Sequence, residues 1–188
     1  MFSATIITLA VVAVAAMAVM TIFNSLVALG RRCDQASADI DVQVKQRYDL
    51  IPNLVEIVKG YAGHERGTLE SVMKARAASY QAATPAAAVQ ADAALGSALG
   101  RLMAVAESYP DLKASANFTE LQAELADTEN KIAAARRYLN SAINEYNTTR
   151  EQFPANVVAG MFSFASRDGT VIARDDRARV EAAPAVHF

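Results

Sequence analysis

Cysteine, histidine and tryptophan are almost absent from this 188-residue chain, which has one, two and none of them. The single cysteine, Cys33, excludes an intrachain disulfide bond and is consistent with a reducing compartment. Three protein ligands are usual for zinc, and only His64 and His187 could supply imidazoles. A zinc-protease motif starting at His64 would need a second histidine at position 68, which is Thr68. We therefore expect no metal and no other cofactor.

Catalytic motifs are also missing from the sequence. The eight glycines are scattered and form no phosphate-binding loop, and no Ser-His-Asp arrangement with an oxyanion hole can be recognised. Glu-x-x-His pairs, which di-metal helical bundles require, do not occur. The formal net charge is −2, and the two signs are interspersed without a basic stripe for nucleic acid. The chain is predicted not to be an enzyme and not to bind nucleic acid.

No charged side chain precedes Arg31, and nearly every residue from Phe2 to Leu29 is apolar or small. A helix of this length, at roughly 1.5 Å per residue, exceeds the roughly 30 Å hydrocarbon core of a bilayer. The alternative, a cleaved signal peptide, would need a basic region before an apolar stretch of only about 7–15 residues. We predict a retained membrane anchor over residues 1–30. Its anchoring residues are Phe2, Ile6, Leu9, Val12, Met17, Ile22, Leu26 and Leu29.

Arg31 and Arg32 follow the apolar run directly and are predicted to set its orientation. Because cytoplasmic flanks carry the excess of basic residues, the N-terminus is expected outside and the body in the cytoplasm. A periplasmic body is the alternative. Between the arginines and the body, Cys33 is interpreted as a small juxtamembrane residue, and a redox or acylation site is the alternative.

Abundant alanine, scarce glycine and proline, and little strand-like alternation are typical of an all-α protein. Apolar residues that recur at intervals of three and four predict helices over residues 3–48, 52–82, 85–108 and 117–153. Prolines are predicted to break the helices. These helix breaks are Pro52, Pro85, Pro110 and Pro154. An apolar turn at 155–165 is expected to pack back on the body, and 166–188 to form a mobile tail.

Four long helices with short links predict an antiparallel four-helix bundle over residues 31–165, with the first helix continuing into the bilayer. The fourth helix has a coiled-coil-like heptad seam. The predicted core residues are Leu54, Val58, Leu69, Val72, Leu99, Leu102, Leu121, Leu125, Ile132 and Leu139.

Four charged residues are candidates for interhelical ion pairs: Glu65, Arg76, Glu129 and Arg136. Glu65 and Arg76 fall on the apolar stripe of the second predicted helix, while Glu129 and Arg136 share one face of the fourth. Ion pairs across the bundle would fix its register, since a wrong register leaves a charge in a low-dielectric environment. The alternative is that all four side chains are solvated on helix faces.

Ordered motifs cover nearly the whole chain. They are FNSLV at 23–27, YDLIPNLVE at 48–56, VKGYA at 58–62, HE at 64–65, RLMAVAE at 101–107, YPDLK at 109–113, NF at 117–118, TENKI at 128–132, AAR at 134–136, YN at 146–147 and FP at 153–154. In this set and order, the sequence resembles the LemA family. It departs at Ser37 and Leu139, where the family often has tryptophan and tyrosine.

The resemblance implies a bacterial membrane-anchored helical bundle, usually with a short N-terminus outside, hence a protein of the inner membrane. It also implies a link to a branch associated with magnetosome membranes, and it implies no established reaction.

We expect a scaffold that self-associates laterally and organises or shapes a membrane patch. A membrane tether raises the effective concentration and gives neighbours a common orientation, which favours repeated contacts. The expected partners are the lipid bilayer and further copies of the chain. If the heptad seam serves only the intramolecular core, the alternative is a monomeric adaptor or sensor that binds and tunes another membrane protein, such as a kinase or protease.

Overall fold

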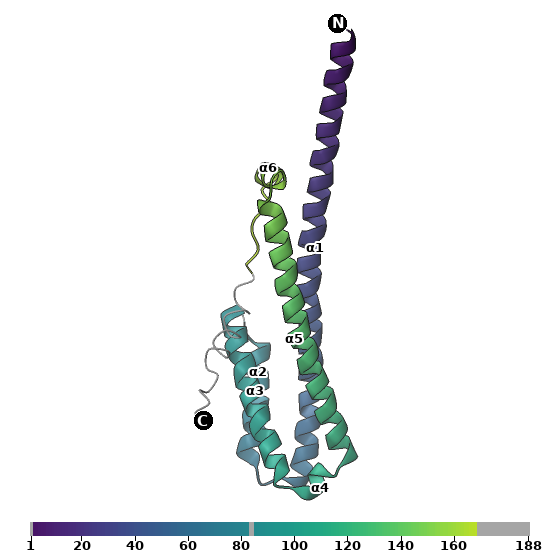
Figure 1. Cartoon of the computed structure of the whole chain (residues 1–188). Helices are drawn as coiled ribbons and strands as arrows, with labels where there is room; N and C mark the ends of the chain where they lie inside the picture. The colour runs from purple at the N-terminus through teal and green to yellow at the C-terminus, as the bar shows by residue number, and fades with distance from the viewer. Residues whose placement is uncertain (1, 83–84, 169–188) are drawn as a thin grey trace, which may run out of the picture. The chain divides into compact units, whose positions relative to one another are not determined.

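The computed structural model describes residues 2–82 and 85–168 (Figure 1). All regular structure in these residues is α-helical, as the composition predicts. The helices are α1 (Phe2–Tyr61), α2 (Arg66–Tyr80), α3 (Pro85–Glu107), α4 (Pro110–Lys113), α5 (Ala116–Glu151) and α6 (Ala155–Met161).

The chain divides into two compact units, and α1 and α5 each contribute a segment to both. Of the described residues, the first unit takes 2–38 and 136–168, and the second takes 39–82 and 85–135. The division inside α1 falls at Ala38, and the boundary between anchor and body at residue 30 stays a prediction. The predicted mobile tail, 166–188, lies outside the described residues from position 169 onward.

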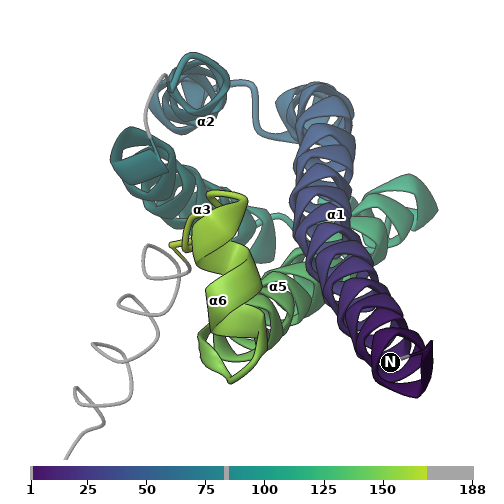
Figure 2. The same ribbon diagram turned by 90° about the horizontal axis from the view of Figure 1, so that it is seen from above.

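The second unit is built on one apolar core to which α1, α2, α3, α4 and α5 all contribute. Within this core α2 and α3 lie side by side (Figure 2). Its deepest residues include Ile51 and Val58 of α1, Val72 of α2 and Leu102 of α3. Most of the predicted core residues are buried, whereas Leu121 here and Leu139 in the first unit are only half-buried.

The predicted helix break at Pro52 is wrong, because α1 passes through Pro52 and continues to Tyr61. Proline cannot donate the hydrogen bond that residue 52 would make to the carbonyl of Tyr48, four residues earlier. In this fold the Nε of Arg76 donates to that carbonyl oxygen instead, at 2.8 Å. Burial of Ile51 and Leu54 on either side of the proline also favours the helical path.

The helix that begins in the apolar segment ends instead at the turn 62–65. The structure therefore has α1 (Phe2–Tyr61) and α2 (Arg66–Tyr80) where the sequence predicted helices over 3–48 and 52–82. The other three predicted helix breaks lie at or just before helix starts. Pro85 begins α3 and Pro110 begins α4, where a missing backbone N–H costs little. Pro154 is the residue before α6. The predicted helices 85–108 and 117–153 correspond closely to α3 and α5.

The first unit packs α1 against the C-terminal part of α5. Its core cluster consists of Leu29, Cys33, Ala142, Ile143 and Tyr146, with Leu139 packed against it. The expected apolar turn at 155–165 contains α6 and the start of a returning segment that bonds back to α5.

Candidate functional site

The N-terminal part of α1 presents an apolar surface that the described protein does not cover. Every side chain from residue 2 to 21 is exposed, apart from the half-buried Val19. In the described chain α1 is the helix that is long and apolar enough to cross a membrane, and its most hydrophobic window has none of its residues buried. An uncovered surface of this size is unfavourable in water and suits a lipid environment.

The few polar side chains of this segment make hydrogen bonds within the helix. The hydroxyls of Thr5, Thr8 and Thr21 donate to the carbonyl oxygens of Phe2, Ala4 and Met17 at 2.8, 2.9 and 2.8 Å. These bonds give each hydroxyl proton an acceptor without water, as a hydrocarbon environment requires.

Two of the predicted anchoring residues, Leu26 and Leu29, are buried against protein and do not belong to the uncovered apolar surface. Leu26 is 0% exposed, and Leu29 belongs to the core cluster with α5. Exposure falls at Ile22 and Phe23, which are half-buried. The uncovered segment 2–21 would span roughly 30 Å as a helix, close to the hydrocarbon thickness of a bilayer. The periodicity could not reveal this boundary, because an apolar face that contacts lipid and one that contacts α5 have the same composition.

The two arginines predicted to set the orientation lie just beyond this segment. Arg31 is exposed, and Arg32 forms an ion pair with Glu145 of α5 at 2.9 Å. Nearby, Asp34 accepts a hydrogen bond from Arg167 at 2.5 Å. This hydrogen bond holds the pKa of Asp34 below its usual value and raises the pKa of Arg167. The basic flank is thus tied by charge pairs to α5 and the returning segment.

Cys33 is buried in the first unit's core cluster. Burial raises the pKa of its thiol above the ordinary 9.0. Because the thiolate is the reactive form, a buried thiol with a raised pKa is a poor nucleophile. This environment favours the interpretation of Cys33 as a packing residue over that of a redox or acylation site.

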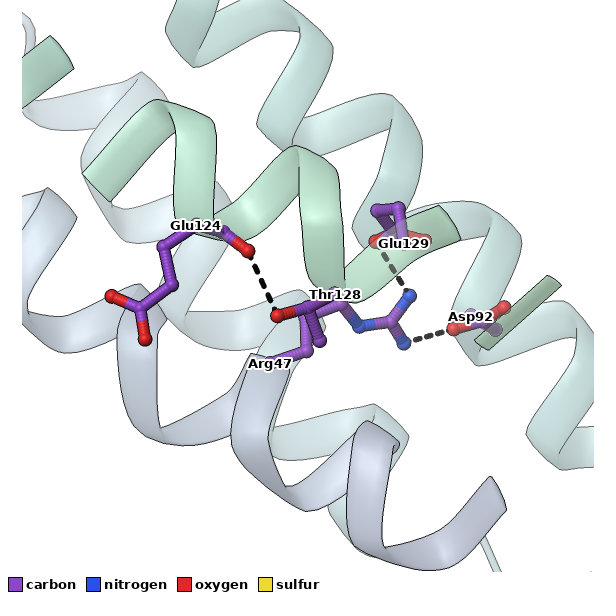
Figure 3. Close-up of polar contacts among 5 residues, drawn as sticks. All are labelled: Arg47, Asp92, Glu124, Thr128 and Glu129. Atoms are coloured by element: carbon purple, nitrogen blue, oxygen red, sulfur yellow. Dashed lines mark hydrogen bonds and ion pairs between the residues drawn. The ribbon is translucent and has the colours of Figure 1, made fainter. Parts of the chain in front are cut away.

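A charge cluster links three helices of the second unit (Figure 3). The guanidinium of Arg47, only 2% exposed, donates to Glu129 of α5 at 2.8 Å and also to Asp92 of α3. Asp92 and Glu129 keep partial access to solvent. Beside them the buried Thr128 donates its hydroxyl to the carbonyl oxygen of Glu124 at 2.8 Å.

The four predicted ion-pair candidates differ in their surroundings. Glu129 does have a charged partner on another helix, namely Arg47. Arg76 reaches another helix but bonds the backbone of Tyr48 rather than a carboxylate. Glu65 precedes α2 in the turn 62–65 and has no ion-pair partner among the described residues. Arg136 is half-buried on α5, and its cross-helix ion pair stays a prediction.

Sequence reasoning missed Arg47 and Asp92 as members of the cluster. Their signal was present, since Asp92 precedes Leu95 and Leu99 on the apolar stripe of α3 and Arg47 follows Val44 on that of α1. A charge on an apolar stripe indicates a buried partner, but spacing along one helix cannot identify the helix that supplies it. The remaining candidate, His64, is exposed in the turn between α1 and α2.

Comparison with known proteins agrees with the motifs. The model of the LemA family matches residues 36–188. The chain is also similar to the magnetosome protein MamQ of Magnetospirillum gryphiswaldense, with 24% identity over 168 residues that cover 76% of this chain and 62% of the relative. Two magnetosome proteins of Paramagnetospirillum magneticum, MamQ 1 and MamQ 2, match with 25% identity and the same coverage.

The chain thus spans 62% of the length of these relatives. The family match extends from within α1 to the end of the chain and takes in most of the helical body. The ordered motifs, the helical structure and this match lead to one conclusion: the chain belongs to the LemA family.

Proposed function

We propose that this protein is a single-pass membrane scaffold that self-associates laterally and organises or shapes a patch of bilayer. One observation carries the proposal: α1 is continuous from the uncovered apolar segment to Tyr61. The same helix supplies the membrane anchor and the buried residues Ile51, Leu54 and Val58 of the second unit's core. A body joined to its anchor by an unbroken helix has a restricted orientation, which favours repeated lateral contacts.

The proposed body is an antiparallel four-helix bundle formed by α1, α2, α3 and α5 with coiled-coil-like packing. The shared core of the second unit supports it, because all four helices contribute to that core, and the Arg47 cluster also joins three of them, α1, α3 and α5. On the outward faces, Val42 of α1 and Tyr138 of α5 are exposed apolar side chains and the candidate contact residues between copies.

The proposed location is the bacterial inner membrane, with the N-terminus outside and the body in the cytoplasm. Arg31 and Arg32, directly after the apolar segment, support this orientation. The relatives are named as magnetosome proteins, and a role in organising such a compartment is one form that the proposal takes. The protein would act by binding lipid and further copies, without catalysis, cofactor or nucleic acid.

The alternative is a monomeric adaptor or sensor that binds another membrane protein and tunes it. Exposed apolar side chains such as Val42 would serve such a partner equally well. The two proposals differ in what the purified protein does alone. A scaffold forms clusters without any other protein, whereas an adaptor stays single until its partner is supplied.

Single-molecule photobleaching in supported bilayers separates these alternatives. The fluorescently tagged full-length chain is reconstituted at increasing density, and bleaching steps are counted in each diffusing spot. We expect clusters that grow with density. The double variant Val42→Lys with Tyr138→Lys should give smaller clusters, whereas Gln90→Lys, a charge added at an exposed site on α3, should not. Single bleaching steps at every density would contradict the scaffold and support the adaptor.

A further inference from the structure

The turn at the end of α5 exposes a group of large apolar side chains. No charged residue occurs between Glu151 and Arg167. Helix α6 buries Ala155, Val158 and Ala159 on one face. The exposed side chains, which we call the apolar tip, are Phe153, Val157, Met161 and Phe162, exposed by 83%, 54%, 68% and 49%. A soluble surface rarely gathers such residues without a partner.

The apolar tip is held against the anchor helix within the first unit. The ring of Phe23 packs edge-on against the rings of Phe162 and Phe164, with centroids 5.0 and 5.4 Å apart. Figure 1 shows α6 beyond the end of α5 and beside α1. Phe23 lies two residues after the exposed apolar segment of α1, so the tip continues this apolar surface at the C-terminal end of the segment.

Polar contacts just below the tip fix this arrangement. The hydroxyl of Tyr146 donates to the carbonyl oxygen of Ala165 at 2.9 Å, and the Nε of Arg150 donates to that of Phe164 at 2.7 Å. The side chain of Asn147 both donates to the carbonyl and accepts from the N–H of Arg167, at 2.8 and 3.0 Å. The returning segment is therefore fixed to α5, and the apolar side chains are presented by an ordered turn.

The length of the exposed segment places the tip at a membrane boundary. Residues 2–21 cover roughly 30 Å of helix, the thickness of the hydrocarbon core. Phe23 then lies at the edge of the hydrocarbon core. Arg31 lies about 12 Å further along the helix, among the headgroups or beyond them. Aromatic side chains are favoured at this level of a bilayer.

We propose that the apolar tip inserts into the bilayer interface beside the point where α1 leaves the membrane. The occupant is lipid, because the tip is continuous with the lipid-facing surface through Phe23. The nearest charged residues along the chain, Arg150 and Glu151 before the tip and Arg167 after it, lie outside the uncharged run 152–166 that contains the tip. A second contact beside the anchor restricts rotation of the first unit about the axis of α1. The proposal requires α1 to cross the bilayer but does not require self-association.

The absence of tryptophan from the chain gives a clean test. Full-length single-tryptophan variants Met161→Trp and Phe153→Trp are reconstituted into phosphatidylcholine vesicles. Quenching of their fluorescence is measured with brominated lipids and with aqueous iodide. The reference inside the span is Val12→Trp, and the matched control is Ser141→Trp, at an exposed site on α5 about 15 Å before the helix ends.

Insertion predicts that brominated lipid quenches both tip variants, that iodide quenches them weakly, and that Ser141→Trp shows the reverse. Iodide quenching at the tip equal to that at Ser141→Trp would overturn the proposal. Protection of the tip from both quenchers would also overturn the proposal, because it would indicate that a second copy of the chain covers the tip instead of lipid. If brominated lipid does not quench Val12→Trp either, both the membrane anchor and the insertion of the tip are rejected. Quenching at Val12→Trp without quenching at the tip rejects this inference alone.

Discussion

At the scale of single residues, the burial of the Arg47 guanidinium in the second unit carries a desolvation cost. Removing a guanidinium from water costs several kcal/mol unless its charge and hydrogen bonds are compensated. Asp92 of α3 and Glu129 of α5 compensate the charge, while the Nε of Arg47 is buried without a hydrogen-bond partner among the described residues. The cluster therefore adds little net stability over an apolar core, but it favours the one helix register that brings these three residues together.

We predict that Arg47→Ala destabilises the protein by about 3–5 kcal/mol, since it leaves a cavity at a fully buried site and removes the cation that Asp92 and Glu129 bind. Glu129→Gln should cost less than about 1 kcal/mol, because the side chain is 45% exposed and water can replace its bond. Denaturant unfolding of the full-length chain in mild detergent, followed by far-UV circular dichroism, measures both. Equal unfolding midpoints for Arg47→Ala and the unsubstituted chain would contradict the role of the cluster.

Cys33 should resist thiol reagents in the folded protein and react quickly after unfolding, because it is buried and its pKa is raised. The sign of the pH effect follows from the same shift. As the pH rises past the ordinary 9.0, the unfolded chain loses the thiol proton before the folded chain does, so stability falls there. Labelling with a maleimide, detected by mass spectrometry, tests the protection. Rapid labelling of the native protein at neutral pH would show that the first unit opens or packs differently.

At the scale of helices, α1 departs most from the prediction, and its departure has a specific cause. The local rule that proline ends a helix assumes that the freed carbonyl stays unpaired and that packing does not oppose the break. Here Arg76 of α2 pairs the carbonyl of Tyr48, and the buried Ile51 and Leu54 hold the helical path. Arg76 therefore acts as a support for α1, a role that its position on α2 alone could not indicate.

This role predicts a thermodynamic coupling between Arg76 and Pro52. Arg76→Met should cost about 1–3 kcal/mol, because the carbonyl of Tyr48 loses its donor. In a Pro52→Ala background the same change should cost less, since alanine at this position supplies the backbone N–H that proline lacks. A double-mutant cycle from urea unfolding measures the coupling. An identical cost in both backgrounds would mean that Arg76 acts independently of the proline.

The features that could be predicted from the sequence depend on nearby residues, and the features that could not depend on residues far along the chain. The limits of α3 and α5 could be predicted because proline and apolar spacing within the same segment set them. The path through Pro52, the Arg47 cluster and the burial of Leu26 depend on contacts with residues far along the chain. Glu129 could be identified as a candidate from its helix face, but its partner Arg47 could be found only from the fold.

At the scale of the whole molecule, the apolar segment and the arginines after it predict an orientation. In a Cys33→Ala background, a membrane-impermeant maleimide should label a cysteine inserted between Met1 and Phe2 in intact cells and should label Gln90→Cys only after permeabilisation. The inserted cysteine precedes the apolar segment and Gln90 has an exposed side chain on α3, so a difference between them reports the side of the membrane. The opposite pattern would place the body outside the cytoplasm.

The central claim is that the protein assembles on membranes by itself. Electron cryo-microscopy of the purified full-length chain in liposomes, without any other protein, tests this most directly. We predict rings, tubes or arrays at the vesicle surface, and smaller particles when the same protein is held in mild detergent. Uniform small particles scattered on undistorted vesicles would contradict the scaffold and favour the adaptor that binds another membrane protein.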